Sequence, residues 1–408
     1  MNLLVINQPL NNRGDESAHK ALIRALKNKF PNCNISVLFV GANNNSINQF
    51  DVKMSNVEYI NLHRIKAFNR FAIWSLKYNS CIFLKIHPTI CKIIDIYKKA
   101  DYIICAPGGI CMGGFQNWMH LFMLKLAKYL NKPLIYYGRS FGPFPTSTKA
   151  NRIFKKISLE MLNYFSFLSI RDKKTEKLAK DLNLKYISTV DTAFLDSPKV
   201  DLPAEIISQI GNKDYMVFVP NLLIWHYKYK NQITKETVIN FYKHIIDEIN
   251  HLYPKLNIVM LPQTFNYGTY LGDDINFFKD IKKETKSSNI IIIDDKYSSD
   301  IQQTVISKAK FLIGARYHSV VFAINNNIPF IALSYEHKIA GLLISLEKTD
   351  RLVDITNLSN NDNMRILEIV IKCLLDLRTD EKTQIKAKDT AYRCFEKLTV
   401  LLSKKEAI

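Results

Sequence analysis

The sequence predicts an α/β protein built from two doubly wound domains. Short apolar runs alternate with helix-spaced segments along most of its 408 residues, and this alternation restarts near residue 215. The length is sufficient for two domains of ordinary size. Apolar residues make up 47% of the chain and charged residues 23%, as is typical of a soluble globular protein.

Residues 1–198 are expected to form the first Rossmann-like domain. Residues 3–6 have the pattern of a buried strand, and a glycine-containing turn leads from them into a helix with apolar residues at helical spacing. The same alternation continues to Pro198. Further strands are expected at 34–41, 101–106, 133–138, 167–171 and 184–187, and helices at 121–130 and 149–166.

Residues 199–378 are expected to form a second Rossmann-like domain, entered through a linker and a helix at 200–214. Residues 379–408 have the pattern of an amphipathic helix and are expected to cross back to the first domain. Two Rossmann-like halves of similar size predict the GT-B arrangement, with a cleft between them. The second half has expected strands at 215–220, 257–261 and 290–294, and helices at 235–252 and 299–309.

The most informative segment is residues 311–338, FLIGARYHSVVFAINNNIPFIALSYEHK. Its first apolar run ends at Gly314, and Arg316 and His318 follow at the expected strand-to-helix turn. Ligands of open parallel sheets bind at the carboxyl ends of strands, where a helix N-terminus offers free N–H groups. Guanidinium, imidazole and helix start together favour a small anion such as a phosphate or a carboxylate.

Five further motifs precede the GARYHS motif at 314–319. They are NNRGDESAHKALIRAL at 11–26, APGGICMGG at 106–114, YGRSFGPF at 137–144, SIRDKKT at 169–175 and VDTAFL at 190–195. In this order the six motifs resemble the polysaccharide pyruvyltransferase family, over roughly residues 5–350. That family's GT-B fold agrees with the fold expected above.

The resemblance implies transfer of a pyruvyl group from phosphoenolpyruvate (PEP) to two hydroxyls of a sugar, which forms a cyclic ketal in cell-surface or capsular polysaccharide. Arg316 and His318 are the expected catalytic residues. A guanidinium pairs with phosphate or carboxylate in bidentate fashion, and an imidazole binds phosphate or donates a proton. The other expected PEP contacts are Arg171, Tyr317, Ser319 and Lys338.

Acceptor contacts are expected in turns at the same sheet edges, with Glu336 as a base for a sugar hydroxyl. The other expected acceptor residues are Asn12, Asp15, Gly108, Gly109 and Ser140. The glycines allow close approach of backbone to ligand. No G-x-G-x-x-G occurs, so no dinucleotide site is expected. No cluster of His and acidic residues at ligand spacing occurs, so neither a metal nor a cofactor is expected, and PEP is a co-substrate.

Several of these residues also fit structural roles. Arg316 fits an ion pair with a neighbouring acid, and His318 fits a helix cap. Arg171 fits an ion pair with Asp172 or Asp191. Asp15 fits the N-cap of the helix that follows it.

The charge pattern favours anionic partners. The net charge is +19, from 56 Lys and Arg against 37 Asp and Glu, which fits anionic substrates, an anionic membrane or general basicity. Residues 64–100 combine cations and aromatics with a single acid, Asp95. They are interpreted as two helices with solvated lysines or as a peripheral membrane contact, which would suit a lipid-linked sugar acceptor. No nucleic-acid module occurs, so nucleic acid is not an expected partner.

The seven cysteines are odd in number and contain no C-x-x-C. This usage is typical of a reducing compartment, so the expected location is cytoplasmic. The membrane interpretation of residues 64–100 would place the protein at the inner face of the cell membrane. No apolar stretch is long enough to span a bilayer. Two other functions fit the chain. A GT-B nucleotide-sugar glycosyltransferase would use Glu336 as its ribose contact, and a non-catalytic scaffold would not need Arg316 and His318.

Overall fold

The computed structural model describes residues 1–48, 54, 56–79, 84, 86–226, 229–230, 232–265, 273–294, 296–359 and 363–403. By their internal contacts the residues form two compact units. The first consists of Met1–Leu10, Ala18–Asp196 and Thr390–Ile408, and the second of Asn11–Ser17 and Ser197–Asp389. The main division, after Asp196, lies two residues before the boundary expected from the sequence. Residues 11–17 belong to the second unit by their contacts, although the sequence suggested the first.

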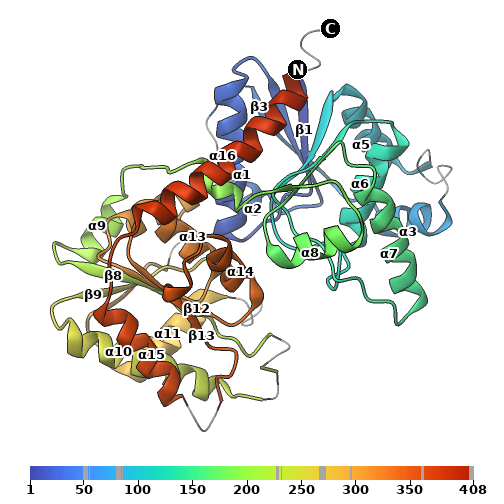
Figure 1. Ribbon diagram of the computed structural model, residues 1–408. Helices are drawn as coiled ribbons and strands as arrows, with labels where there is room; N and C mark the ends of the chain where they lie inside the picture. Colours follow the sequence, from blue (N-terminus) through green and yellow to red (C-terminus); the bar gives the residue numbers. More distant parts are fainter. Residues whose placement is uncertain are drawn as a thin grey trace. The chain divides into compact units, whose positions relative to one another are not determined.

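The first unit contains a parallel sheet of seven strands in the order β3-β2-β1-β4-β5-β6-β7 (Figure 1). The strands are β1 (Asn2–Ile6), β2 (Asn34–Val40), β3 (Val57–Leu62), β4 (Tyr102–Cys105), β5 (Leu134–Tyr136), β6 (Phe167–Ile170) and β7 (Ile187–Ser188). Strand order reverses between β1 and β4, which is therefore the topological switch point of this sheet, the place where ligands of open parallel sheets bind. β4 is buried along its whole length, as expected for a parallel strand covered on both faces.

Helices connect these strands. They are α1 (Arg13–Lys29), α2 (Asn44–Ile47), α3 (Phe68–Tyr78), α5 (Pro88–Lys99), α6 (Trp118–Tyr129), α7 (Lys149–Leu162) and α8 (Lys173–Asp181), with the 3₁₀ helix η2 (Thr192–Leu195) after β7. Several begin at a side-chain cap: Asn117 accepts from the backbone N–H of His120 at 3.0 Å, and Thr148 accepts from that of Asn151 at 3.1 Å.

The second unit contains a parallel sheet of six strands in the order β10-β9-β8-β11-β12-β13. The strands are β8 (Tyr215–Val219), β9 (Asn257–Met260), β10 (Ile290–Ile292), β11 (Leu312–Gly314), β12 (Phe330–Ser334) and β13 (Leu352–Asp354). The switch point of this sheet lies between β8 and β11. The second unit includes α9 (Ala204–Ile210), α10 (Lys235–Leu252), α11 (Asp274–Thr285), α12 (Ser299–Ser307), α13 (Tyr317–Asn325), α14 (His337–Ser345), η3 (Thr349–Arg351), α15 (Met364–Leu375) and the start of α16 (Glu381–Ser403).

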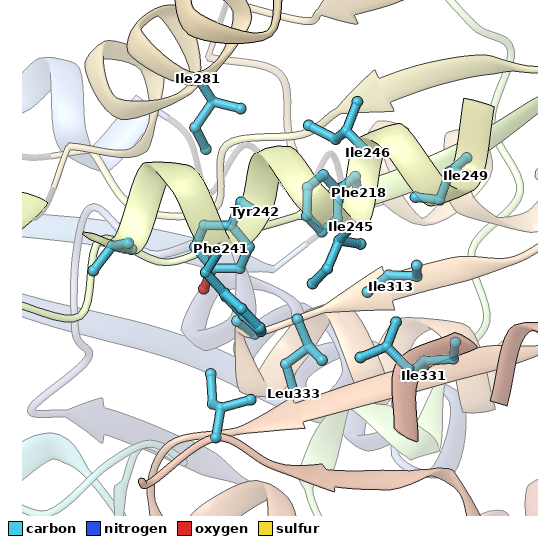
Figure 2. Close-up of a cluster of buried hydrophobic side chains, with 14 of the residues drawn as sticks. Phe218, Phe241, Tyr242, Ile245, Ile246, Ile249, Ile281, Ile313, Ile331 and Leu333 are labelled. Atoms are coloured by element: carbon cyan, nitrogen blue, oxygen red, sulfur yellow. The ribbon is translucent and has the colours of Figure 1, made fainter. Parts of the chain in front are cut away.

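The core of the second unit lies between its sheet and the helices α10, α11 and α15. Figure 2 shows the side chains of α10, among them Tyr242 and Ile245, facing Ile313 of β11 and Leu333 of β12. Removing one such buried side chain costs about 2–5 kcal/mol. This packing fixes the strands after which the candidate site residues follow.

The expected fold class, an α/β protein with two doubly wound parallel sheets, is confirmed. The helix expected at 235–252 has these bounds in the structure. Within the described ranges, five helices, α2, α8, α11, α14 and α15, and two strands, β3 and β13, were not expected. β3 (VEYINL) contains polar residues, β13 (LVD) is short, and α8 (KKTEKLAKD) is mostly polar. Hydrophobic periodicity is therefore weak in all three. Among the described residues, no helix is long and apolar enough to cross a membrane.

Candidate functional site

Arg316 follows β11 at the switch point of the second sheet and is the N-cap residue of α13. Its guanidinium forms an ion pair with Asp274, the first residue of α11. The other carboxylate oxygen of Asp274 accepts from the backbone N–H groups of Gln263 at 2.9 Å and Thr264 at 3.0 Å. Asp274 therefore holds Arg316 against the turn that follows β9.

Part of the Arg316 guanidinium is not used by this ion pair. Its Nε is buried, and no residue in the described part of the chain accepts a hydrogen bond from it. Burial lowers the pKa of Arg316, but the charge and hydrogen bond of Asp274 outweigh this, and the net pKa lies above its usual value. A partly buried, permanently charged donor with an unused N–H is suited to an anionic ligand.

His318 lies in the first turn of α13 and is almost entirely buried. Its ring lies against the start of α1: a Cβ built on Gly14 would be 1.8 Å from His318 Nδ1. Residue 14 must therefore lack a side chain for α1 to begin where it does. Asn12 caps this helix, because its side-chain oxygen accepts from the N–H groups of Gly14 at 2.8 Å and Asp15 at 3.2 Å. The N-cap is thus Asn12, not Asp15.

Ser319 and Tyr317 flank His318 in the same turn. The hydroxyl of Ser319 donates to the carbonyl of Arg316 at 2.6 Å, so the side chain reinforces the helix start. A Cβ on Gly314 would lie 2.2 Å from this hydroxyl oxygen. Gly314 therefore permits the tight turn between β11 and α13. Tyr317 and His318 make an edge-to-face ring contact with centroids 5.0 Å apart.

A second group of charged residues follows β12 in the same unit. Glu336 accepts a salt bridge from Lys338 at 3.1 Å, and His226 Nε2 lies 4.0 Å from its other oxygen. Tyr335 stacks edge-on to the rings of His226, at 5.5 Å, and Trp225, at 6.1 Å. Burial, and then the charge of Glu336, raise the pKa of Tyr335, so it stays a neutral phenol.

Asn221 shapes the loop after β8 that carries Trp225 and His226. It is fully buried, and its side-chain oxygen accepts from the N–H of Leu223 at 3.2 Å and the indole of Trp225 at 3.0 Å. Tyr242 of α10 donates to the carbonyl of Asn221 at 3.0 Å. The second unit thus gathers Arg316, His318, Glu336 and Lys338 at the carboxyl edge of its sheet.

Sequence reasoning did not single out Asp274, His226 or Tyr335 as site residues. Two features of the sequence could have indicated His226 and Asp274. His226 follows the expected strand 215–220, so it had to lie at the same sheet edge as Arg316. Asp273 and Asp274 precede an amphipathic stretch, as acids at a helix start do. The pairing of Asp274 with Arg316 depends on tertiary packing that no local pattern shows.

Arg171 follows β6 in the first unit, and both it and Asp191 are buried there as an ion pair. Asp191 also accepts from the N–H of Ala193 at 3.0 Å. This geometry agrees with the structural interpretation of Arg171, the ion pair with Asp191.

Gly108, Gly109 and Ser140 follow β4 and β5 in the first unit. The carbonyl of Gly109 accepts from Arg139 Nε at 3.0 Å, and the backbones of Gly108 and Arg139 form an isolated parallel β-bridge. Ser140 donates to Asp172 at 2.5 Å. Arg139 is fully buried and also donates to the carbonyl of Ala106 at 2.6 Å. Gly108 and Gly109 thus contact a buried arginine that joins the ends of neighbouring strands, and Ser140 follows this arginine in the sequence.

A pocket of about 520 Å³ lies beside this arginine, wholly within the first unit. Its volume is in the range of small-molecule sites. Polar and charged residues of its lining include Asn7, Arg64, Asn117, His120 and Arg139, and apolar ones include Leu38, Phe39, Phe68 and Met123. Burial, and then the charge of Arg139, lower the pKa of His120 well below its usual value, so its imidazole is neutral.

Known proteins resemble this chain in sequence and in fold. It is 24% identical over 278 residues to the amylovoran biosynthesis protein AmsJ of Erwinia amylovora; the match covers 65% of this chain and 64% of that protein. The chain thus spans slightly less than two thirds of the length of this relative.

Among solved structures, a UDP-GlcNAc 2-epimerase from Methanocaldococcus jannaschii matches with a TM-score of 0.59 and 13% identity, over 98% of this chain and 100% of that one. The Arabidopsis thaliana protein UGT89C1, complexed with UDP-L-rhamnose, matches with a TM-score of 0.57 and 11% identity, over 98% of each chain. At this identity the likeness shows a shared GT-B fold. Residues 12–337, most of the chain, match the polysaccharide pyruvyl transferase family, and the chain therefore belongs to that family.

Proposed function

We propose that this protein transfers a pyruvyl group from PEP to two hydroxyls of one sugar residue, forming a cyclic ketal during synthesis of a cell-surface or capsular polysaccharide. The observation that carries the proposal is Arg316: a partly buried cation at the switch point of the second sheet, with a buried and unused Nε, in a chain of the pyruvyl transferase family. PEP offers a phosphate and a carboxylate on three carbons, and both are bidentate partners for guanidinium.

In this proposal the PEP site consists of Arg316, His318 and Lys338, with the backbone N–H group of Tyr317 at the start of α13. Ser319 supports the turn, because its N–H donates to the carbonyl of Arg316 at 3.1 Å. Arg316 and Lys338 supply fixed positive charge, and the helix N-terminus adds a partial one. Their role is to neutralise and orient PEP, which is electrostatic and positional catalysis. We leave Arg171 out of the site, because it is paired with the buried Asp191 and, unlike Arg316, has no buried nitrogen without a hydrogen-bond partner in the described part of the chain.

The reaction needs one proton delivered to the methylene carbon of PEP, which makes the adjacent carbon electrophilic. One sugar hydroxyl adds there, the C–O bond to phosphate breaks, and the second hydroxyl adds to close the ring. Of the two hydroxyl protons, one replaces the proton given to the methylene and one leaves with phosphate. We assign the proton donor role to His318 and the role of hydroxyl base to Glu336.

For the acceptor we propose a lipid-linked oligosaccharide and a reaction in the cytoplasm, at the inner face of the membrane. Asn12, Asp15, Gly108, Gly109 and Ser140 remain the acceptor contacts proposed from the sequence. In the first unit we add the pocket beside Arg139, since amide side chains next to an apolar wall suit a sugar ring. No cofactor or metal takes part in this proposal.

The test is phosphate release from PEP by purified protein, with a panel of lipid-linked and soluble glycans, together with mass spectrometry of the glycan. We expect PEP-dependent phosphate release and a glycan heavier by one pyruvyl ketal. Arg316→Ala should abolish both while circular dichroism stays unchanged. Calorimetry that finds no PEP binding, but binding of a nucleotide sugar, would overturn the proposal in favour of a glycosyltransferase.

A further inference from the structure

The segment at residues 63–78 of the first unit is exposed, cationic and aromatic. No Asp or Glu occurs between Tyr59 and Ile94 in the sequence. The loop before α3 exposes Ile65, which is 47% accessible, beside Lys66. In a chain that is basic throughout, the feature that distinguishes this segment is the presence of large apolar side chains among its cations.

α3 presents two different faces. One buries Phe68, Ala72, Ser75 and Leu76 and packs against α6, beside which Figure 1 shows it in the first unit. The opposite face repeats every three to four residues, the spacing of one helix stripe. We call this exposed stripe and the preceding loop the α3 surface, which comprises Ile65, Lys66, Arg70, Trp74, Lys77 and Tyr78.

The apolar part of the α3 surface is unusually accessible. Trp74 is 38% and Tyr78 70% exposed. Cations lie close to aromatic rings here: the guanidinium of Arg70 lies 5.9 Å from the Trp74 ring, and the ammonium of Lys77, which precedes Tyr78, lies 5.6 Å from the ring of Trp118. Trp and Tyr among Lys and Arg are the residues that proteins place at the headgroup level of membranes.

We propose that the α3 surface binds the anionic face of a lipid bilayer. Charge complementarity selects this occupant: the surface offers three cations and no carboxylate, and anionic headgroups supply the opposite charge. The exposed ring of Trp74 and the side chain of Ile65 enter the interface, and the cations contact lipid phosphates. Binding is peripheral and reversible, because the apolar contact is small.

This inference deepens the proposed function, on which its last step rests. The pocket in the first unit is lined by Arg64 and Phe68, which belong to the same segment as the α3 surface. A glycan in that pocket would therefore lie next to the bilayer contact. The class of acceptor that fits is a glycan on a lipid carrier, with Arg64 positioned for the phosphate of that carrier.

Vesicle sedimentation of the full chain tests the bilayer contact. We expect binding to vesicles of phosphatidylglycerol and phosphatidylcholine, little binding to phosphatidylcholine alone, and release by salt. The variant Lys66→Gln with Arg70→Gln should bind about 30-fold more weakly, as expected for the loss of two surface cations. These residues lie outside the PEP site, so PEP affinity and phosphate release with a soluble glycan should not change.

The matched control is Lys174→Gln with Lys177→Gln. Both lysines are exposed on α8 of the same unit, and α8 exposes no large apolar side chain among its described residues. The control should bind anionic vesicles as the wild type does. If both double variants lose the same vesicle affinity, the binding reflects the general basicity of the chain. If the wild type binds neutral vesicles as tightly as anionic ones, charge does not direct the contact. Either result overturns the inference, and neither bears on PEP chemistry.

Contact with the bilayer is tested independently by quenching of tryptophan fluorescence with brominated lipid. We expect partial quenching that Trp74→Phe removes, because Trp74 is the tryptophan on the α3 surface. Quenching that persists in Trp74→Phe would place the contact elsewhere and overturn the inference. If the same Lys66 and Arg70 substitutions instead abolish retention on single-stranded nucleic acid, without an effect on vesicles, the partner is a nucleic acid.

Discussion

The ring of His318 occupies the space that a side chain at residue 14 would need. A Cβ on Gly14 would lie 1.8 Å from Nδ1 and 1.9 Å from Cγ of this histidine. The first turn of α1 and the first turn of α13 therefore touch through a glycine and an imidazole. The contact fixes the ring of the proposed proton donor.

Gly14→Ala should reduce both stability and activity, because the added methyl group must displace the His318 ring. We expect a loss of about 1–3 kcal/mol in the free energy of unfolding, typical of overpacking, and a lower kcat for phosphate release. Denaturant unfolding and the phosphate assay measure the two effects.

Gly341→Ala is the matched control for this substitution. Gly341 lies in α14, and a Cβ built there meets no atom within 4 Å. Alanine at a helix interior is favoured over glycine by about 0.5–1 kcal/mol, so this variant should be at least as stable as the wild type. Wild-type stability in Gly14→Ala would show that the ring moves aside without cost.

Arg316→Lys should weaken PEP binding although it keeps the charge. Lysine lacks the planar fork that reaches Asp274 and an anion together. Hydrogen bonds to charged groups contribute about 1.5–3 kcal/mol, so we expect a rise in Kd of tenfold or more by calorimetry. Arg378→Lys, at an arginine 67% exposed in the same unit, is the control and should leave Kd unchanged. An unaltered Kd in Arg316→Lys would remove Arg316 from the PEP site.

Arg171→Gln distinguishes a structural arginine from a substrate contact. Loss of the cation leaves Asp191 buried with an uncompensated charge, which costs about 3–5 kcal/mol. We therefore expect a lower Tm, and an unchanged Kd for PEP measured below the unfolding transition. A Kd raised tenfold with an unchanged Tm would support the direct contact with PEP expected from the family resemblance.

Asp380→Asn should destabilise the protein in a pH-dependent manner. Partial burial alone would raise the pKa of Asp380, but hydrogen bonds from Lys348 and Thr383 lower it to about 2. Because the folded pKa lies below the unfolded one, this stabilisation is present above about pH 4 and is lost as the pH falls towards 2.

At pH 7 we expect a loss of about 1 kcal/mol in Asp380→Asn, less than the full shift implies because solvent screens a side chain that is partly exposed. Urea unfolding at a series of pH values measures it. Asp201→Asn, at an exposed acid, should show no comparable change. A deficit in Asp380→Asn that stays constant down to pH 2 would assign the effect to helix capping alone.

Local pattern predicted much of the fold and part of the site. α10 was predictable because a capping Thr234 precedes apolar residues at helical spacing. Arg316 and His318 were predictable as neighbours because a strand-turn-helix places them at one sheet edge. Asp274 was not predictable as the partner of Arg316, since it lies in another helix and the two meet only through tertiary packing. The membership of residues 11–17 in the second unit is likewise a property of packing.

α1 and α16 have a consequence for any attempt to divide this protein. By contacts, α16 passes from the second unit to the first at Thr390, where its residues Ala391, Cys394 and Leu398 are buried. Tyr392 donates to the carbonyl of Leu195 at 3.0 Å, and Tyr102 donates to that of Leu401 at 3.2 Å. A gene cut after Asp196 would therefore separate each unit from one of its own segments. The first fragment would lack the part of α16 from Thr390 onward, and the second would lack residues 11–17, which include the start of α1. Such fragments should be soluble only when they are produced together, so we expect the whole chain, and neither fragment alone, to fold.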